Sequence, residues 1–212
     1  MPAPQRKRRP DARPDEILAA ALKVFSEKGF SAARVEDVAR EAGLSKGAVY
    51  LYFASKEAML EALVEQSAGR LASAAEQLIT QGAPDDPAGA YRAVLRLMMT
   101  ALASPDVSAA PRIVLTEAGR FPALAAFYRE RVLSVARRAM SALLDAGVAT
   151  GAFRRVDTDA FMRVAGGPAF MHMVLTQILD FQPEHLRSPE EMADAIADLV
   201  LHGVLPREEL AP

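Results

Sequence analysis

The sequence predicts an all-α fold of about nine helices, with a small three-helix unit at the N-terminus and a larger helical unit after it. Apolar residues recur at the spacing of one helical face through most of the 212 residues, and no stretch alternates with a period of two for long enough to indicate a sheet. Glycines and prolines fall between these stretches and divide the chain into helical pieces.

The N-terminal unit is predicted from three short periodic stretches. Residues 1–12 are rich in proline and arginine, and we expect them to be disordered. Pro14 suits the first turn of a helix and Gly29 suits its end. Gly43 then marks a tight turn, after which Ser45 can cap the next helix. We therefore expect helices over residues 14–28, 35–42 and 46–53.

Six longer helices are predicted after this unit. Ser55 can cap the first of them, and Ser188 with Glu191 forms a capping-box signature before the last. We expect Pro111 to disturb one helix and Gly166-Gly167-Pro168 to kink or break another. The expected ranges are 56–82, 87–103, 106–120, 122–148, 158–181 and a final helix that starts at 189. The predicted domains are residues 13–56 and 57–212.

The composition argues against several classes of protein. The chain has no cysteine, which excludes disulfides and fits a reducing compartment, so we expect a cytoplasmic protein. Its three histidines lie far apart, so neither a metal nor another cofactor is predicted. The most apolar stretch, 164–179, is shorter than the roughly 20 residues of a membrane span, and no membrane association is expected. No catalytic triad, phosphate loop or carboxylate pair stands out, so an enzyme is not predicted.

Charge is distributed unevenly along the chain. Residues 1–56 carry 11 lysines and arginines against 7 acidic residues, whereas residues 57–212 carry 14 against 20. All five lysines lie in the first segment. A basic head on an acidic body indicates that the head meets a polyanion. The arm Arg6-Lys7-Arg8-Arg9 either contacts the DNA minor groove or phosphates, or is a solvated tail that adds only nonspecific attraction.

The two short helices around Gly43 have the layout of a helix-turn-helix. The second helix of such a motif must expose small or polar residues at its N-terminal end, so that its backbone can approach base edges in a major groove about 12 Å wide. Lys46-Gly47-Ala48 meets this requirement, with one cation followed by two residues that have almost no side chain. Tyr50 and Tyr52 can each offer a hydroxyl to phosphate.

The run from Ile17 to Leu63 resembles the DNA-binding domain of the TetR family. The resemblance is carried by Ile17-Leu18-Ala19-Ala20-Ala21, Phe25-Ser26-Glu27-Lys28-Gly29-Phe30, the stretch from Val35 to Gly47, Val49-Tyr50-Leu51-Tyr52-Phe53 and Lys56-Glu57. It implies a dimeric transcriptional repressor that binds double-stranded operator DNA and a small-molecule effector. The DNA-binding residues that it implies are Arg34, Glu36, Ser45, Lys46, Gly47, Ala48, Tyr50, Leu51, Tyr52 and Lys56.

Three positions depart from the family pattern. Arg34 stands where serine or threonine is usual, so it loses a helix cap worth about 1 kcal/mol but can reach phosphate as a cation. Ala48 stands where threonine is common, and Leu51 is apolar where a polar or aromatic residue is frequent. These changes concern which operator is bound.

The resemblance also implies an effector pocket in the body. Thioether and aromatic side chains suit lipophilic ligands of varied shape, although such residues are also ordinary core. Glu117 could hold a cationic ligand, or could pair with Arg120 or solvent. A stretch from Glu117 to Leu124 further resembles a C-terminal domain type of part of the family. The expected pocket residues are Met98, Met99, Leu102, Ile113, Val114, Glu117, Phe121, Phe127, Phe161, Met162 and Phe170.

In the TetR family the last two long helices pair with their copies in a dimer, and the apolar helices 158–181 and 189 onward resemble them. A buried core helix is the alternative for the first of these. Dimerisation would place two heads about one DNA turn apart on a palindrome. The expected interface residues are Ala165, Ala169, His172, Met173, Met192, Ile196, Leu199 and Val200. Two rival functions stay open, a DNA-binding regulator without a small-molecule effector and a helical carrier or enzyme.

Overall fold

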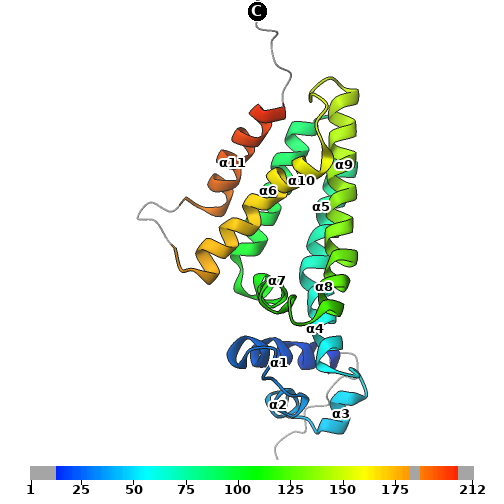
Figure 1. The fold of residues 1–212 in the computed structure, drawn as a ribbon, viewed down its shortest axis with the longest axis vertical. Coiled ribbons are helices and arrows are strands. Elements are labelled where there is room, and N and C mark those ends of the chain that lie inside the picture. The colour runs from blue at the N-terminus through cyan, green and yellow to red at the C-terminus, as the bar shows by residue number, and fades with distance from the viewer. Residues whose placement is uncertain (1–12, 182–186, 205–212) are drawn as a thin grey trace, which may run out of the picture.

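The fold is built from helices, which confirms the predicted class. A computed structural model describes residues 13–181 and 187–204, and these ranges contain no strand. Short helices form a head at one end of the elongated molecule, and longer helices form a body that extends away from it (Figure 1). None of the helices in these ranges is long and apolar enough to cross a membrane.

The head contains α1 (Arg13–Lys28), α2 (Val35–Glu41) and α3 (Lys46–Tyr50), and α4 (Lys56–Val64) leads from it into the body. One π-helical turn at Glu65–Gly69 joins α4 to α5 (Arg70–Gly82) without a break. The body continues with α6 (Pro87–Ala103), α7 (Pro105–Glu117), α8 (Pro122–Tyr128), α9 (Ser134–Ala149), α10 (Thr158–Met173) and α11 (Pro189–Val204). Two further π turns follow α8 and α10, at Arg129–Leu133 and Val174–Ile178.

Local signals placed most helix ends correctly. The Ser188 hydroxyl accepts from the Glu191 N–H at 3.1 Å while the Glu191 carboxylate accepts from the Ser188 N–H at 2.9 Å, so the predicted capping box is present. The Ser55 hydroxyl caps α4 through the Ala58 N–H at 3.1 Å. Helix α3 is shorter than predicted, because residues 51–52 form a turn.

The expected break near Pro168 does not occur. Helix α10 runs through Gly166-Gly167-Pro168, although proline removes one backbone hydrogen bond. The flanking Ala165 and Ala169 are buried against the body, and the Tyr91 hydroxyl donates to the Ala165 carbonyl at 3.0 Å. Packing on this side holds the helix together. Pro111 likewise lies inside α7, which continues past it.

Two apolar clusters form the core. The lower one joins the head to the body through aromatic contacts, because the Phe30 ring meets both Phe25 of α1 and Phe121 before α8 edge-on, each at 5.1 Å between ring centroids. The upper one fills the body around Tyr91, Met99 and Leu143. The head is therefore packed directly onto α7 and α8.

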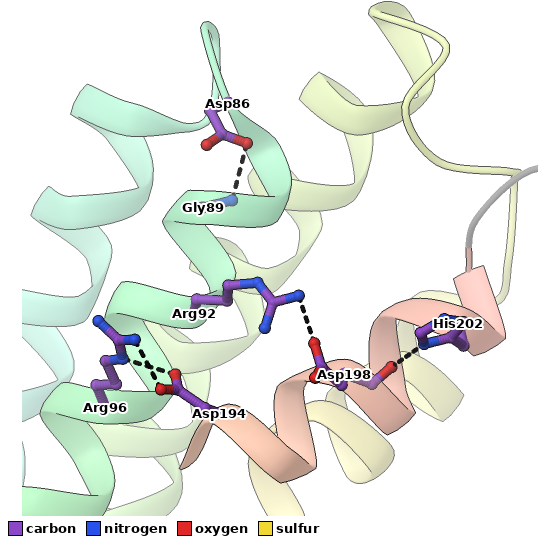
Figure 2. A network of polar contacts seen from close by, with 7 residues as sticks. All are labelled: Asp86, Gly89, Arg92, Arg96, Asp194, Asp198 and His202. Atoms are coloured by element: carbon purple, nitrogen blue, oxygen red, sulfur yellow. Dashed lines mark hydrogen bonds and ion pairs between the residues drawn. The ribbon is translucent and has the colours of Figure 1, made fainter. Parts of the chain in front are cut away.

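Helix α11 is fastened along α6 by a ladder of polar pairs. The Arg96 guanidinium donates to both Asp194 carboxylate oxygens at 2.7 Å, and Arg92 pairs with Asp198 at 2.5 Å (Figure 2). One turn further, Thr100 donates to Glu190 at 3.0 Å. The hydrogen bond from Arg96 lowers the pKa of the Asp194 carboxyl. The four-residue spacing on both helices fixes their antiparallel register.

Candidate nucleic-acid interface and apolar cavity

Helix α3 presents its N-terminal end to solvent. The Ser45 hydroxyl accepts from the Ala48 N–H at 3.2 Å, so the predicted cap is present. Gly43 has a φ of +64° in the preceding turn, a value that favours glycine. Val49 is fully buried and anchors α3 on the head core. The exposed face of the motif then consists of Lys46, Gly47, Tyr50, Leu51 and Tyr52, with Ala48 half-buried beside them.

An ion pair across the turn joins the two helices of the motif. The Lys46 ammonium contacts the Glu36 carboxylate, and it lies 5.7 Å from the centroid of the Tyr50 ring. The hydrogen bond with Lys46 lowers the pKa of Glu36, and the same bond raises the pKa of Lys46. Lys46 thus stays charged on the exposed surface, and phosphate bound there would compete with Glu36 for it.

Arg34 begins α2 without a side-chain cap, as its replacement of serine or threonine predicts. Its backbone is extended, and its N–H donates to the Asp37 carboxylate at 3.2 Å. The Lys28 ammonium also donates to Asp37, at 2.7 Å, and this bond is the main cause of the lowered pKa of Asp37. The Arg34 side chain is exposed and can extend toward a phosphate.

The Lys56 ammonium is bound within the head. Its ammonium donates to three backbone carbonyls of the turn after α1, those of Phe30, Ser31 and Ala33, at 2.7, 3.0 and 3.1 Å. It also lies 4.7 Å from the centroid of the Phe30 ring. All three donors of the ammonium are used inside the head, so a phosphate contact of Lys56 would have to replace one of these bonds.

Replacing Lys56 with methionine is expected to destabilise the head by about 2 kcal/mol, since hydrogen bonds to a charged group are removed and carbonyls lose their partner. Thermal unfolding followed by circular dichroism measures this. Lys23→Met is the matched control, because the Lys23 ammonium pairs with the Glu41 carboxylate on the surface, at 2.6 Å, and with no backbone carbonyl of the described residues. Equal unfolding temperatures for the two variants would contradict the structural role of Lys56.

The body contains an apolar cavity of about 230 Å³ that is partly open to solvent. It lies between α5, α6, α9 and α10, and four of the expected pocket residues line it, namely Met98, Leu102, Met162 and Phe170. Sequence reasoning missed Tyr91, Leu95, Tyr128 and Met140, which line it as well. Of these, Tyr91 and Tyr128 could have been found from the sequence, because each is a tyrosine within an apolar helical stretch. Burial of such a residue places a hydroxyl that needs a polar partner inside the body.

The other seven expected pocket residues lie elsewhere. Met99 and Phe161 belong to the upper core, and Val114 and Phe127 pack in the lower one. Ile113 and Glu117 line a separate hollow between α1 and α7, and Phe121 lines a small one beside α8. Ile113 and Glu117 do not line the main cavity because of helical geometry. Pro111 of α7 faces that cavity, and positions 113 and 117 lie on the opposite side of the helix.

Glu117 connects the body to the head. Its carboxylate accepts from the Ser31 hydroxyl at 2.8 Å. This contact was not among the expected ones, which were a cationic ligand, Arg120 and solvent. Helix α7 therefore meets the cavity at Pro111 and the head at Glu117.

Exposed apolar side chains gather near the C-terminal end of the described chain. Six of the twelve exposed large apolar residues lie between positions 164 and 199, namely Val164, Met171, Ile178, Leu179, Phe181 and Leu199. They belong to α10, α11 and the segment after α10, and the two helices lie side by side (Figure 1). Leu199, an expected interface residue, is 78% exposed. An exposed apolar surface of this kind indicates a protein contact.

The expected interface needs a correction at four positions. Ala165, Ala169, Met173 and Val200 are between 0% and 7% exposed and pack in the upper core of the protomer itself. The side of α10 that carries the first three, and the side of α11 that carries Val200, face the body of the protomer and not its outer surface. His172, Met192 and Ile196 are half-buried, and burial lowers the pKa of His172.

The geometry defines a class of protein, a helix-turn-helix head mounted on a helical body with an internal apolar cavity. Residues 17–63 match the family model described as bacterial regulatory proteins, tetR family, and residues 84–200 match that of the tetracyclin repressor-like C-terminal domain. The chain belongs to the TetR family of bacterial regulatory proteins.

Individual relatives agree with this assignment. The transcriptional repressor KstR2 of Mycolicibacterium smegmatis is 26% identical over 205 residues, which is 95% of each chain. The regulators YuxN and YfiR of Bacillus subtilis are 37% and 48% identical over 82 and 59 residues, and there this chain spans only 28% and 29% of their length.

Solved structures share the fold. FadR of Bacillus halodurans, described as a fatty acid degradation regulator, has a TM-score of 0.74 at 23% identity, over 93% of this chain and 98% of that one. PfmR of Thermus thermophilus, a TetR family regulator, has a TM-score of 0.68 at 27% identity, over 88% and 97%.

Proposed function

We propose that this protein is a homodimeric, cytoplasmic repressor that binds a palindromic operator and leaves it when a small apolar molecule enters the cavity. The observation that carries the DNA-binding part is the exposed N-terminal end of α3, where Lys46, Gly47 and Tyr50 stand clear of the head core. A helix end without bulky side chains fits a major groove.

The apolar cavity favours an effector-responsive regulator over one without an effector. A cavity with apolar walls and a few polar groups is the usual form of a small-molecule site. Two helices connect it to the head. Ala68, Leu71 and Ala72 on the α4–α5 helix line the cavity, and α7 spans from the cavity to Ser31. In a dimer the two heads can be spaced so that they fit the operator or so that they do not. A ligand that binds better to the second arrangement would shift the dimer toward it, and this is the coupling that we propose.

Selection of DNA from a random duplex pool tests the DNA-binding part. Wild type is expected to enrich one palindromic site, and a Lys46→Ala, Tyr50→Ala double variant is expected to bind it about 100-fold more weakly, because each lost contact costs about 1–3 kcal/mol. Both side chains are exposed, so the variant keeps the head core.

Lys23→Ala is the control in the same head, since Lys23 lies on α1 and pairs with Glu41. It is expected to enrich the same site as wild type. Equal enrichment by wild type and the double variant would mean that α3 does not select the sequence, and the proposal would fail.

A further inference from the structure

Two buried tyrosines of the cavity differ in how their hydroxyls are satisfied. The Tyr91 hydroxyl donates to the Ala165 carbonyl at 3.0 Å. The Tyr128 side chain is only 8% exposed, and its hydroxyl oxygen is buried with no hydrogen-bond partner among the described residues. Buried polar groups in native proteins nearly always have a partner, so an exception of this kind indicates a ligand or a bound solvent molecule.

Burial keeps the Tyr128 hydroxyl protonated. It raises the pKa of Tyr128 well above its ordinary value of 10.0, since ionisation in an apolar environment is unfavourable. At neutral pH the group is therefore a neutral hydrogen-bond donor that can also accept.

The rest of the cavity wall has little to offer a charged ligand. Among the described residues that line it, Arg163 is the one with a charged side chain. It is exposed, and its guanidinium donates to the Asp159 carbonyl one turn earlier at 2.8 Å. A ligand charge placed beside Tyr128 would have to be desolvated without a buried counter-ion, which is strongly unfavourable.

The volume limits the size of the enclosed part of the ligand. An engineered protein cavity of about 150 Å³ holds one benzene molecule. By that comparison the 230 Å³ here accommodates roughly ten non-hydrogen atoms. A fused pair of six-membered rings has this size.

We infer that the effector is an uncharged, largely apolar molecule with one carbonyl-type oxygen, and that the Tyr128 hydroxyl donates a hydrogen bond to that oxygen. This inference rests on the proposed function, because it takes the cavity to be the effector site. It adds the chemical class of the ligand and the residue that distinguishes it from a plain hydrocarbon.

A matched pair of probes tests the inference on the full chain. The ketone 1-tetralone and the hydrocarbon tetralin share a bicyclic skeleton and differ at one carbon, and isothermal titration calorimetry measures the affinity of each. The ketone and the hydrocarbon lose different amounts of hydration on binding, so their affinities for wild type differ for this reason alone. The ratio of the two affinities is therefore compared between wild type and each variant. Tyr128→Phe is expected to lower the ketone-to-hydrocarbon ratio about tenfold, as for loss of a hydrogen bond to a buried donor.

Tyr91→Phe is the comparison variant, because the Tyr91 hydroxyl already donates to the Ala165 carbonyl, and it should lower the ratio less than Tyr128→Phe does. If both probes bind and Tyr128→Phe leaves the ratio unchanged, the inference is overturned while the effector site stands. Tighter binding of 1-naphthoate than of 1-tetralone to wild type would also overturn it, because that anion would need a counter-ion. If no probe binds wild type, the effector part of the proposed function fails together with the inference.

Discussion

Replacing Leu199 with arginine is expected to convert the protein from a dimer to a monomer and to abolish operator binding. Leu199 lies on α11 and is among the most exposed apolar side chains of the body. In a two-fold interface each substitution occurs twice, and each arginine would be buried against an apolar partner surface without a counter-ion. Self-association should therefore weaken on the order of 1,000-fold, since each unpaired buried charge costs several kcal/mol.

Sedimentation velocity at micromolar concentration measures the change. Leu115→Arg is the matched control, because Leu115 is 52% exposed on α7, outside the cluster on α10 and α11. It should remain dimeric. If Leu199→Arg is still a dimer, α11 is not in the interface. If Leu115→Arg is the variant that dissociates, the partner binds the α7 side.

The α6–α11 ladder supports this choice of position. Arg92 and Arg96 hold Asp198 and Asp194 on the side of α11 that faces α6, where Ala193 and Ala197 are fully buried. Leu199 is not part of this contact. The variant therefore changes an exposed position of α11 and does not alter the residues of the two ion pairs with α6, which Figure 2 shows.

The head could be predicted almost completely from the sequence, because its determinants are local. Ser45 caps the helix that it precedes, and Val49 is the apolar residue of a five-residue helix, so exposure of Lys46 and Tyr50 follows from helical spacing. The contacts of Lys56 within the head could not be predicted, for the opposite reason. Its partners lie 23 to 26 residues earlier in the chain, and only the packing of α4 against the turn after α1 brings them together.

The cavity and the dimer surface could be predicted only in part. Helical periodicity shows which residues are apolar, but in a helix that is apolar on all sides it does not show which face meets which neighbour. The adjacent Met98 and Met99 illustrate this, because the first lines the cavity and the second is core. On α10 the prediction chose Ala165 and Ala169, whereas the exposed apolar side chains are Val164 and Met171.

Replacing Gly147 with alanine is expected to lower stability by about 3 kcal/mol, at the upper end of the cost of overpacking a core. A Cβ atom at Gly147 would lie 2.0 Å from Cδ2 and 2.5 Å from Cγ of the Phe153 ring. Phe153 is only 3% exposed, and its N–H donates to the Gly147 carbonyl at 2.9 Å, so neither the ring nor its backbone is free to move away.

Thermal unfolding followed by circular dichroism should show a melting temperature about 10 °C below wild type, at 2–4 °C for each kcal/mol in a chain of this size. Gly203→Ala is the control on another helix, since its added Cβ meets no heavy atom of the described residues within 4 Å beyond its own helix backbone and chain neighbours, and it should be neutral or slightly stabilising. A second change, Phe153→Leu, should restore part of the stability lost in Gly147→Ala, because a smaller side chain removes the overlap.

If Gly147→Ala melts at the same temperature as wild type, the close packing of the α9 end against Phe153 does not contribute to stability. If it melts early but Phe153→Leu gives no recovery, the loss comes from the backbone of α9 and not from this contact.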